Sequence, residues 1–464
     1  MSQEDLLHSW SIERLSLEYA RGSVSPIDAL DSLLAAIKDD FINAFAAVIA
    51  DEAREAARQS AERHKAGKPL SVLDGIPVSI KDLIPVRGLQ TRRGSLATAD
   101  DPAATEDAPV VQLLREAGAI VFAKTTTSEF GWAPISQSGH SGETQNPRAP
   151  GYSAGGSSSG AAAHVAQGWG PLSIGSDAGG SVRVPASYCG LVGFKPTHGA
   201  IPQAPLSALG DFSHLGPLTR SVEDCRLAMS VLSAPHLLDP ASLYSRSANA
   251  LPARPPRIGW ATQVGSITGT DPTITSTVAD LVSRLGENAI IEEIDLSWMD
   301  YAEPLWNVWA PRIYESFMVM PEDRRRLVDP RILKVFEQGS RSNSDRIARG
   351  RAGLRDLSAR LSSLFSRIDF LILPATPTAA LPQGALAPDD HPLAGEIAAS
   401  GNSFAANPLS YPFNVTQQPA IALPLSALPD GRPFGVQLVG RRYADGDVLE
   451  LALTLERLIG KRTG

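Results

Sequence analysis

Apolar residues in this chain fall into two kinds of run, which together predict strands interleaved with helices. Short apolar runs bounded by glycine or proline predict strands at 76–80, 119–123, 171–176, 257–261, 370–373, 419–425 and 434–440. Longer alanine-rich or capped segments predict helices at 25–38, 50–66, 105–117, 160–167, 222–232, 301–320 and 344–366, with a last helix from Gly446. Pro311 is expected to kink or split the helix at 301–320. This order predicts an α/β protein with a mixed or parallel sheet.

Composition narrows the class of protein. The chain has 464 residues, of which 20% are charged and 43% hydrophobic, and its formal net charge is −8. These values are typical of a globular protein and argue against a nucleic-acid binder, which needs a basic face. No apolar run is long enough to span a membrane. Two cysteines and an N-terminus without a signal-peptide pattern predict a cytoplasmic protein.

Two glycine clusters carry serines and lie close together in the sequence. The first is Gly155-Gly156-Ser157-Ser158-Ser159-Gly160, and the second is Gly175-Ser176-Asp177-Ala178-Gly179-Gly180-Ser181-Val182-Arg183. Small residues let the backbone turn sharply. The successive amides of Ala178, Gly179, Gly180 and Ser181 could therefore converge on one oxygen and stabilise an oxyanion.

Lys81 ends the strand predicted at 76–80, upstream of both clusters. A serine needs a base to become a nucleophile, and a lysine can be that base once burial makes it neutral. Asp82 follows directly, and a neighbouring carboxylate could keep the lysine charged. Because successive strand residues point to opposite faces, we expect Asp82 to point away. Lysine, serine and glycines supply the parts of an acyl-transfer site without a histidine.

Other interpretations of these residues are weaker. Gly156 to Gly160 satisfies the G-x-S-x-G elbow of α/β-hydrolases, with Ser158 as nucleophile of an esterase, but no strand is predicted before it. Cys189 lies in a core-facing helical pattern and fits a structural role better than a nucleophilic one. The glycines lack the Gly-Lys-Ser/Thr of a phosphate-binding loop, and the histidines show no metal-ligand spacing. We therefore expect neither a metal nor another cofactor.

The three motifs, in this order and with Ser157 and Ser181 24 positions apart, resemble the amidase signature family. The matching stretch runs from about Asp74 to Gly199. The resemblance implies a Ser–cis-Ser–Lys triad in which Ser181 attacks the carbonyl, Ser157 passes the proton and Lys81 is the base. We expect Asp177 and Arg183 to orient the nucleophile loop, although an ordinary structural ion pair is an equal alternative.

The resemblance also implies the architecture and a set of partners. It predicts one domain over residues 1–464, a twisted mixed sheet covered by helices on both faces, with a variable, substrate-side region at about 234–400. A small-molecule amide is the expected partner, an ester or carbamate is also open to this chemistry, and a homodimer is possible. The rival within the family is the glutamine-hydrolysing subunit of an amidotransferase. That rival commonly has glutamine where this chain has Val184.

Aromatic residues cluster within the variable region. They are Trp298, Tyr301, Trp306, Trp309 and Tyr314. Trp306 and Trp309 are three residues apart and share one helical face. Gly131 and Trp132, after the strand near Lys124, could line the same pocket from the other side. We expect at least one tryptophan to line a pocket for an apolar or aromatic substrate, the alternative being that the rings only pack the core.

Overall fold

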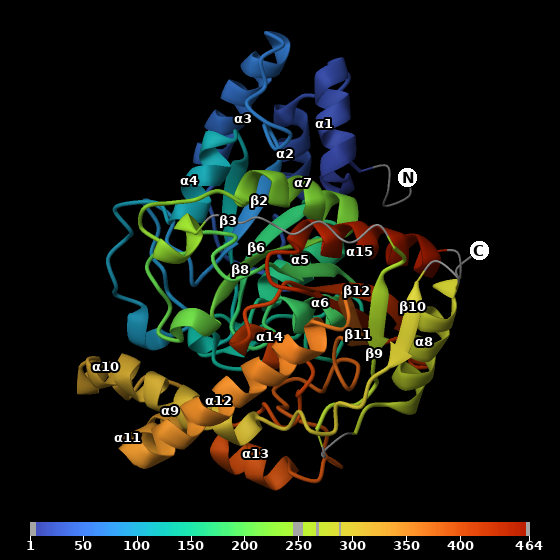
Figure 1. Cartoon of the computed structure of the whole chain (residues 1–464). Helices are drawn as coiled ribbons and strands as arrows, with labels where there is room; N and C mark the ends of the chain where they lie inside the picture. The colour runs from blue at the N-terminus through green and yellow to red at the C-terminus, as the bar shows by residue number, and fades with distance from the viewer. Residues whose placement is uncertain (1–5, 245–253, 266–268, 287–288, 461–464) are drawn as a thin grey trace.

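An eleven-stranded sheet runs through this chain in a computed structural model that describes residues 6–244, 254–265, 269–286 and 289–460 (Figure 1). Its strands lie in the order β1-β3-β2-β6-β8-β7-β12-β13-β11-β9-β10. Their bounds are β1 Phe45–Val48, β2 Pro77–Lys81, β3 Ile120–Thr125, β6 Leu172–Asp177, β7 Val192–Lys195, β8 His214–Thr219, β9 Arg257–Trp260, β10 Ile290–Glu293, β11 Phe370–Pro374, β12 Ala420–Ala427 and β13 Pro433–Gly440. Strands β4 (Gln137–Ser138) and β5 (Gly142–Glu143) form a separate hairpin.

Helices account for most of the remaining described chain. Their bounds are α1 Ile12–Arg21, α2 Pro26–Ala36, α3 Ala50–Lys65, α4 Pro109–Glu116, α5 Ser159–Gln167, α6 Arg183–Cys189, α7 Val222–Leu232, α8 Pro272–Ser283, α9 Ala302–Met318, α10 Glu322–Arg325, α11 Pro330–Ser340, α12 Ser344–Phe365, α13 Ala394–Ser400, α14 Pro412–Val415 and α15 Asp445–Gly460.

Parallel pairing at one part of the sheet brings two predicted site segments to the same edge. Strand β2 pairs in parallel with β3 on one side and with β6 on the other, whereas β8 is antiparallel to β6. The carboxyl ends of β2 and β6 therefore lie side by side. Lys81 is the last residue of β2 and Asp177 the last of β6, so both lie at this edge.

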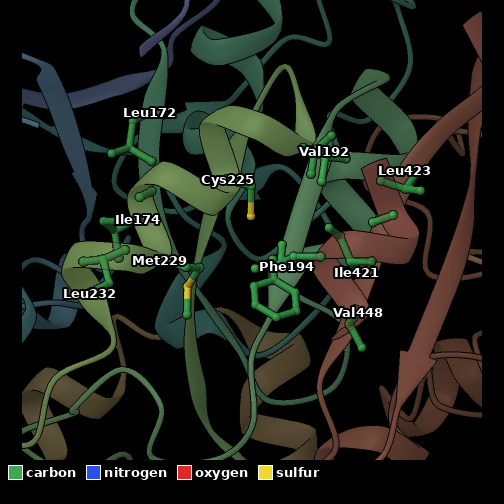
Figure 2. Packing of buried hydrophobic residues seen from close by; sticks show 14 of the residues in the cluster. Leu172, Ile174, Val192, Phe194, Cys225, Met229, Leu232, Ile421, Leu423 and Val448 are labelled. Atoms are coloured by element: carbon green, nitrogen blue, oxygen red, sulfur yellow. The ribbon is translucent and has the colours of Figure 1, made fainter. Parts of the chain in front are cut away.

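Alternation along the strands divides their apolar side chains between two faces, as the pleat requires. On one face, Leu172 and Ile174 of β6 join a buried cluster with Cys225 and Met229 of α7 (Figure 2). On the other face, Ile120 and Phe122 of β3 pack in a cluster with the alanines of α5. Helices thus cover both faces, as the sequence predicts.

A third apolar cluster joins the helical segment between β10 and β11 to the sheet. It contains Trp306 and Trp309 of α9, Leu357 of α12, and Leu371 and Leu373 of β11. Helix α9 contacts both α11 and α12. This cluster, which we call the α9 layer, also contacts Phe130, Trp132, Ala178 and Phe404 near the carboxyl edge of β6.

Two predictions about helices differ from the structure. Helix α4 begins at Pro109 rather than near Thr105, because Ala108 has an extended backbone and proline suits the first helical position. Helix α9 is not split, since it continues across Pro311. Among the described residues, no helix is long and apolar enough to cross a membrane.

Candidate active site

Strand β2 delivers Lys81 to the N-terminus of α5. Val78 and Ile80 face one apolar cluster, so Ser79 and Lys81 point to the opposite face, toward α5. The Lys81 ammonium nitrogen lies 2.7 Å from Ser157 Oγ and 2.9 Å from Ser158 Oγ. It also donates to the Ser176 carbonyl at 3.4 Å. The structure therefore brings Lys81 and Ser157, two residues of the predicted triad, into hydrogen-bond contact.

Backbone packing holds Ser157 in place. The peptide bond between Gly156 and Ser157 is cis. A Cβ on Gly156 would lie 2.2 Å from the Ile135 carbonyl oxygen, so only glycine fits there. The Ser157 carbonyl accepts from the amide of Ser128 at 3.3 Å. Ser157 itself is buried, which keeps its hydroxyl within reach of Lys81.

Burial depresses the basicity of Lys81. Its side chain is fully buried, and the loss of hydration lowers the pKa of the ammonium from 10.5 to about 7, although the charge of Asp177 partly opposes the shift. Asp82 points away, as expected. Its carboxylate instead pairs with Lys124 at 2.6 Å. Lys81 is thus poised to exist as a neutral amine near pH 7.

A buried ion pair shapes the loop that carries Ser181. The Arg183 guanidinium binds the Asp177 carboxylate through two nitrogens, at 2.9 and 3.0 Å, and both side chains are fully buried. The Asp177 oxygens also accept from the amides of Gly180 at 2.7 Å and Val182 at 3.2 Å. Asp177 and Arg183 therefore fix the backbone on both sides of Ser181.

The remaining donors of Arg183 reach across the molecule. They bind the Ser410 carbonyl at 2.9 Å, Gln437 Oε1 at 2.6 Å and Asn414 Oδ1 at 2.6 Å. Asn414 in turn donates to Asp177 Oδ1 at 2.9 Å. This network ties the Ser181 loop to the C-terminal part of the chain.

One of the four expected oxyanion donors is engaged elsewhere. The Gly180 amide donates to Asp177, which corrects the prediction that Ala178, Gly179, Gly180 and Ser181 all offer free amides. The other three amides have no acceptor within the described parts of the chain. An aspartate side chain can accept a hydrogen bond from a backbone amide a few residues further along the chain, as Asp177 does from Gly180. The spacing of the glycines alone does not predict this contact.

A small cleft of about 30 Å³ opens beside Ser181, and we call it the Ser181 cleft. Gly131, Trp132 and Trp309 line it. Trp306 lies one layer deeper, where its indole donates to Gln338 Oε1 at 3.0 Å. Of the two predicted helical tryptophans, the structure thus places only Trp309 on the cleft. The other aromatic residues of the cluster pack elsewhere, with Tyr301 bonded to Asp356 and Tyr314 against Phe336.

Several further residues of the Ser181 cleft were not predicted as lining residues. Phe404 packs edge-on against Trp309, with ring centroids 4.9 Å apart, and Asn407 and Val184 also line the wall. Residues 401–407 carry no motif, so only the tertiary contact with α9 identifies them. Val184 stands at the position where glutamine-hydrolysing members of the family commonly differ from this chain.

A second, larger space adjoins the cleft. This large cavity has a volume of about 440 Å³, and Leu83, Phe130, Trp132 and Ser176 are among its lining residues. Trp132 lines both spaces. Gly131 has a positive φ of 70°, and a Cβ there would lie 2.8 Å from Leu83 Cδ1 and 3.2 Å from Ser157 Oγ. Only glycine therefore fits at 131, between Leu83 and Ser157.

Comparison with known proteins decides the family. A sequence model of the amidase family matches residues 28–449. The chain belongs to the amidase family. It is 32% identical to an acylamidase of Rhodococcus erythropolis over 98% of this chain and 96% of the relative. It is 29% identical to a glutamyl-tRNA(Gln) amidotransferase subunit of Koribacter versatilis, over 91% and 92%. A solved amidase structure superposes with a TM-score of 0.83 at 28% identity, covering 97% and 100%.

Family membership identifies the chain as an amide hydrolase. The alternative nucleophiles Ser158 and Cys189 can then be compared with the structure. The elbow interpretation of Ser158 lacks its strand, because the residues before Ser157 form turns and single bridges. Ser158 is fully buried and hydrogen-bonded to Lys81. Burial also raises the pKa of the Cys189 thiol, which donates to the Ala154 carbonyl. A thiol held in this way is a poor nucleophile.

Proposed function

We propose that this protein hydrolyses amides of apolar or aromatic character through a Ser181 acyl-enzyme, with Ser157 and Lys81 as the proton relay. The observation that carries the proposal is Lys81, a buried amine bonded to two hydroxyls and to no carboxylate. A neutral amine in this setting can take a proton from Ser157. Among the described residues the Ser181 hydroxyl makes no hydrogen bond, which leaves it free to turn toward Ser157 or a substrate.

The reaction would run in two halves. Ser157 takes the proton of Ser181 and passes its own to Lys81, while Ser181 Oγ bonds to the carbonyl carbon and the carbonyl oxygen becomes an oxyanion. The free amides of Ala178, Gly179 and Ser181 are placed to stabilise that charge. The C–N bond then breaks as Ser157 protonates the leaving nitrogen, with Lys81 replacing the proton. Water attacks the acyl-enzyme by the same relay in reverse.

The apolar preference rests on the lining of the Ser181 cleft. Trp132, Trp309 and Phe404 present rings there, and Val184 adds a methyl surface. Glutamine hydrolysis is the second candidate, because the relative from Koribacter versatilis belongs to an amidotransferase. The methyl groups of Val184 disfavour it at that position, although the cleft also holds polar groups, among them Asn407 Oδ1, which has no hydrogen-bond partner among the described residues.

Trapping and turnover together test this proposal. Incubation with an aryl sulfonyl fluoride should add one label, located on Ser181 by peptide mass spectrometry, and should abolish hydrolysis of acetanilide. Ser181→Ala should remove label and activity while the circular dichroism spectrum stays unchanged. A label on Ser158 would contradict the proposal in favour of the elbow. Glutamine hydrolysis without anilide hydrolysis would favour the amidotransferase alternative.

A further inference from the structure

The Ser181 cleft and the large cavity differ in volume, and this difference indicates where the larger part of a substrate binds. The Ser181 cleft, at about 30 Å³, has room for a group of only a few atoms. The large cavity, at about 440 Å³, is within the range of pockets that hold whole small molecules. Trp132 borders both. A substrate therefore places a small group beside Ser181 and its larger part in the large cavity.

The position of Ser157 indicates which part is the larger one. In the proposed function, the leaving nitrogen must come close to Ser157 Oγ, because that hydroxyl protonates it. Gly131 lies directly between Ser157 and Leu83, since a Cβ there would contact both side chains. Leu83 lines the large cavity. The amine side of the amide is thus directed into the large cavity, and the acyl side occupies the Ser181 cleft.

Charged side chains form one wall of the otherwise largely apolar cavity. They are Arg93, Asp101 and Arg324. Arg93 binds one Asp101 oxygen at 3.3 Å and Arg324 binds the other at 2.7 Å. Two guanidinium groups therefore share one carboxylate. Their other nitrogens have no acceptor within the described parts of the chain, so unused donors and a net positive charge remain at this wall.

The backbone holds Arg93 beside the site. Its amide donates to the Asp82 carbonyl at 3.1 Å, and its carbonyl accepts from the Phe130 amide at 2.7 Å. Arg93 also has a positive φ of 52°, which is unusual for a residue other than glycine. Glu322, on the same short helix as Arg324, is engaged with Arg326 and not with this pair.

We propose that Arg93 and Arg324 bind a carboxylate on the amine side of the substrate. The substrate class is then a short-chain acyl amide of an apolar or aromatic amine that carries an anionic group at its far end. Planar guanidinium groups recognise carboxylates through paired, charge-assisted hydrogen bonds, and the apolar walls accept the spacer between that group and the scissile amide. This inference rests on the proposed function, because Ser157 sets the direction of the leaving amine.

Matched substrates test the inference. 3-(4-Acetamidophenyl)propionate carries the carboxylate, and 4-(4-acetamidophenyl)butan-2-one replaces it with a neutral methyl ketone of similar shape. We expect the wild type to favour the carboxylate by about tenfold or more in kcat/KM. Arg324→Gln should lower kcat/KM for the carboxylate by about tenfold and leave the ketone within about twofold. Arg326→Gln, an exposed arginine nearby, is the matched control and should change neither value.

Three results would overturn the inference. They are equal losses on both substrates, no loss in Arg324→Gln or Arg93→Gln, and a loss confined to succinanilate, whose carboxylate is on the acyl side. Binding of 3-(4-acetamidophenyl)propionate to the Ser181→Ala variant, measured by calorimetry, gives a readout that needs no turnover. Binding that depends on Arg324 supports the subsite even if the proposed chemistry is wrong. Turnover of the carboxylate substrate with no arginine dependence contradicts the subsite alone.

Discussion

Three lysines are buried in the described part of the chain, and their hydrogen-bond partners separate one from the other two. Lys124 pairs with the Asp82 carboxylate, and Lys195 donates to the carbonyls of Pro196 and Gln418. Lys81 donates to the hydroxyls of Ser157 and Ser158. A carbonyl oxygen has no proton to give, whereas a hydroxyl can give one up. Lys124 also donates to the Thr91 hydroxyl at 3.0 Å, but its contact with the Asp82 carboxylate favours the charged form, so Lys81 is the one lysine of the three that has hydroxyl partners and no carboxylate in contact.

The pH dependence of activity should follow Lys81. Its pKa of about 7 means that the neutral, active form grows as pH rises, so kcat/KM should increase through pH 7 and then level off. Lys81→Arg should lose at least about a thousandfold in kcat, because arginine stays charged. Initial rates on acetanilide from pH 5 to 9.5 test both statements. A profile that falls as pH rises through 7 would contradict the role of Lys81 as base.

The same pKa shift predicts an effect on stability. The folded state binds the Lys81 proton more weakly than the unfolded state, whose ordinary value is 10.5. This group therefore lowers the free energy of unfolding most below pH 7, and the cost declines as pH rises from about 7 to about 10.5. Lys81→Met should thus exceed the wild type in melting temperature, with the largest margin below pH 7. Differential scanning calorimetry at pH 6 and pH 9.5 measures the margin, and an unchanged margin would be inconsistent with a buried, depressed lysine.

At the scale of elements, the turn between β6 and α6 depends on the Asp177–Arg183 pair. The pair is fully buried and holds the amides of Gly180 and Val182. A buried carboxylate without its partner destabilises the folded state, because its lost hydration is no longer offset by an ion pair. The loop that carries Ser181 is therefore a product of electrostatics as much as of glycine flexibility.

Removing one member of that pair should show the cost. Arg183→Met is expected to lower the free energy of unfolding by about 3–5 kcal/mol and to abolish activity. Arg226→Gln removes an exposed pair with Glu223 on α7 and should change stability by at most about 1 kcal/mol. Urea unfolding followed by tryptophan fluorescence compares the two. Similar stabilities for the two variants would mean that the buried pair contributes little.

Helix α9 provides a test of the aromatic wall. Trp309 lines the Ser181 cleft and Trp306 does not, although both are almost completely buried. Both alanine variants should lose stability, by about 3–5 kcal/mol as is usual for buried tryptophans. Only Trp309→Ala should change the ratio of kcat/KM for butyranilide to that for acetanilide, by about tenfold, because these substrates differ on the acyl side, which occupies the Ser181 cleft. The ratio changing equally in both variants, or in neither, would show that α9 does not select substrates.

At the scale of the whole molecule, the sequence predicted the alternation of strands and helices but not strands β1, β7, β8 and β10, and the family resemblance implied the contact of Lys81 with Ser157. Periodicity placed Lys81 at the end of a strand, and the glycine clusters marked the loops. The sequence did not predict that the Gly180 amide would donate to Asp177, or that Phe404 would pack against Trp309 in the wall of the Ser181 cleft. Both depend on contacts between segments far apart in the chain, which spacing along one helix or loop cannot reveal.

Asn414 offers a test of coupling across the fold. It donates to the Asp177 carbonyl at 2.8 Å and accepts from Arg183 at 2.6 Å, although it lies more than 200 residues downstream. Asn414→Ala should lower kcat by about tenfold or more with little change in KM, because the loop loses alignment rather than substrate contacts. Gln383→Ala, which removes an exposed contact with Gln145, serves as control. A change confined to KM would contradict this coupling.

The partners of Arg183 lie far downstream in the sequence, which has a consequence for the nascent chain during its synthesis on the ribosome. A ribosome delivers Lys81, Ser157 and Ser181 well before Ser410, Asn414 and Gln437, and Gln437 follows Arg183 by 254 residues. At ordinary rates of synthesis that interval lasts roughly 10–50 s. During this interval the Arg183 guanidinium lacks the hydrogen-bond acceptors that allow its burial. The loop that carries Ser181 therefore cannot adopt its folded conformation. Under the proposed function, an incomplete nascent chain therefore contains Lys81, Ser157 and Ser181 but cannot hydrolyse amides, and activity begins only when translation is nearly finished.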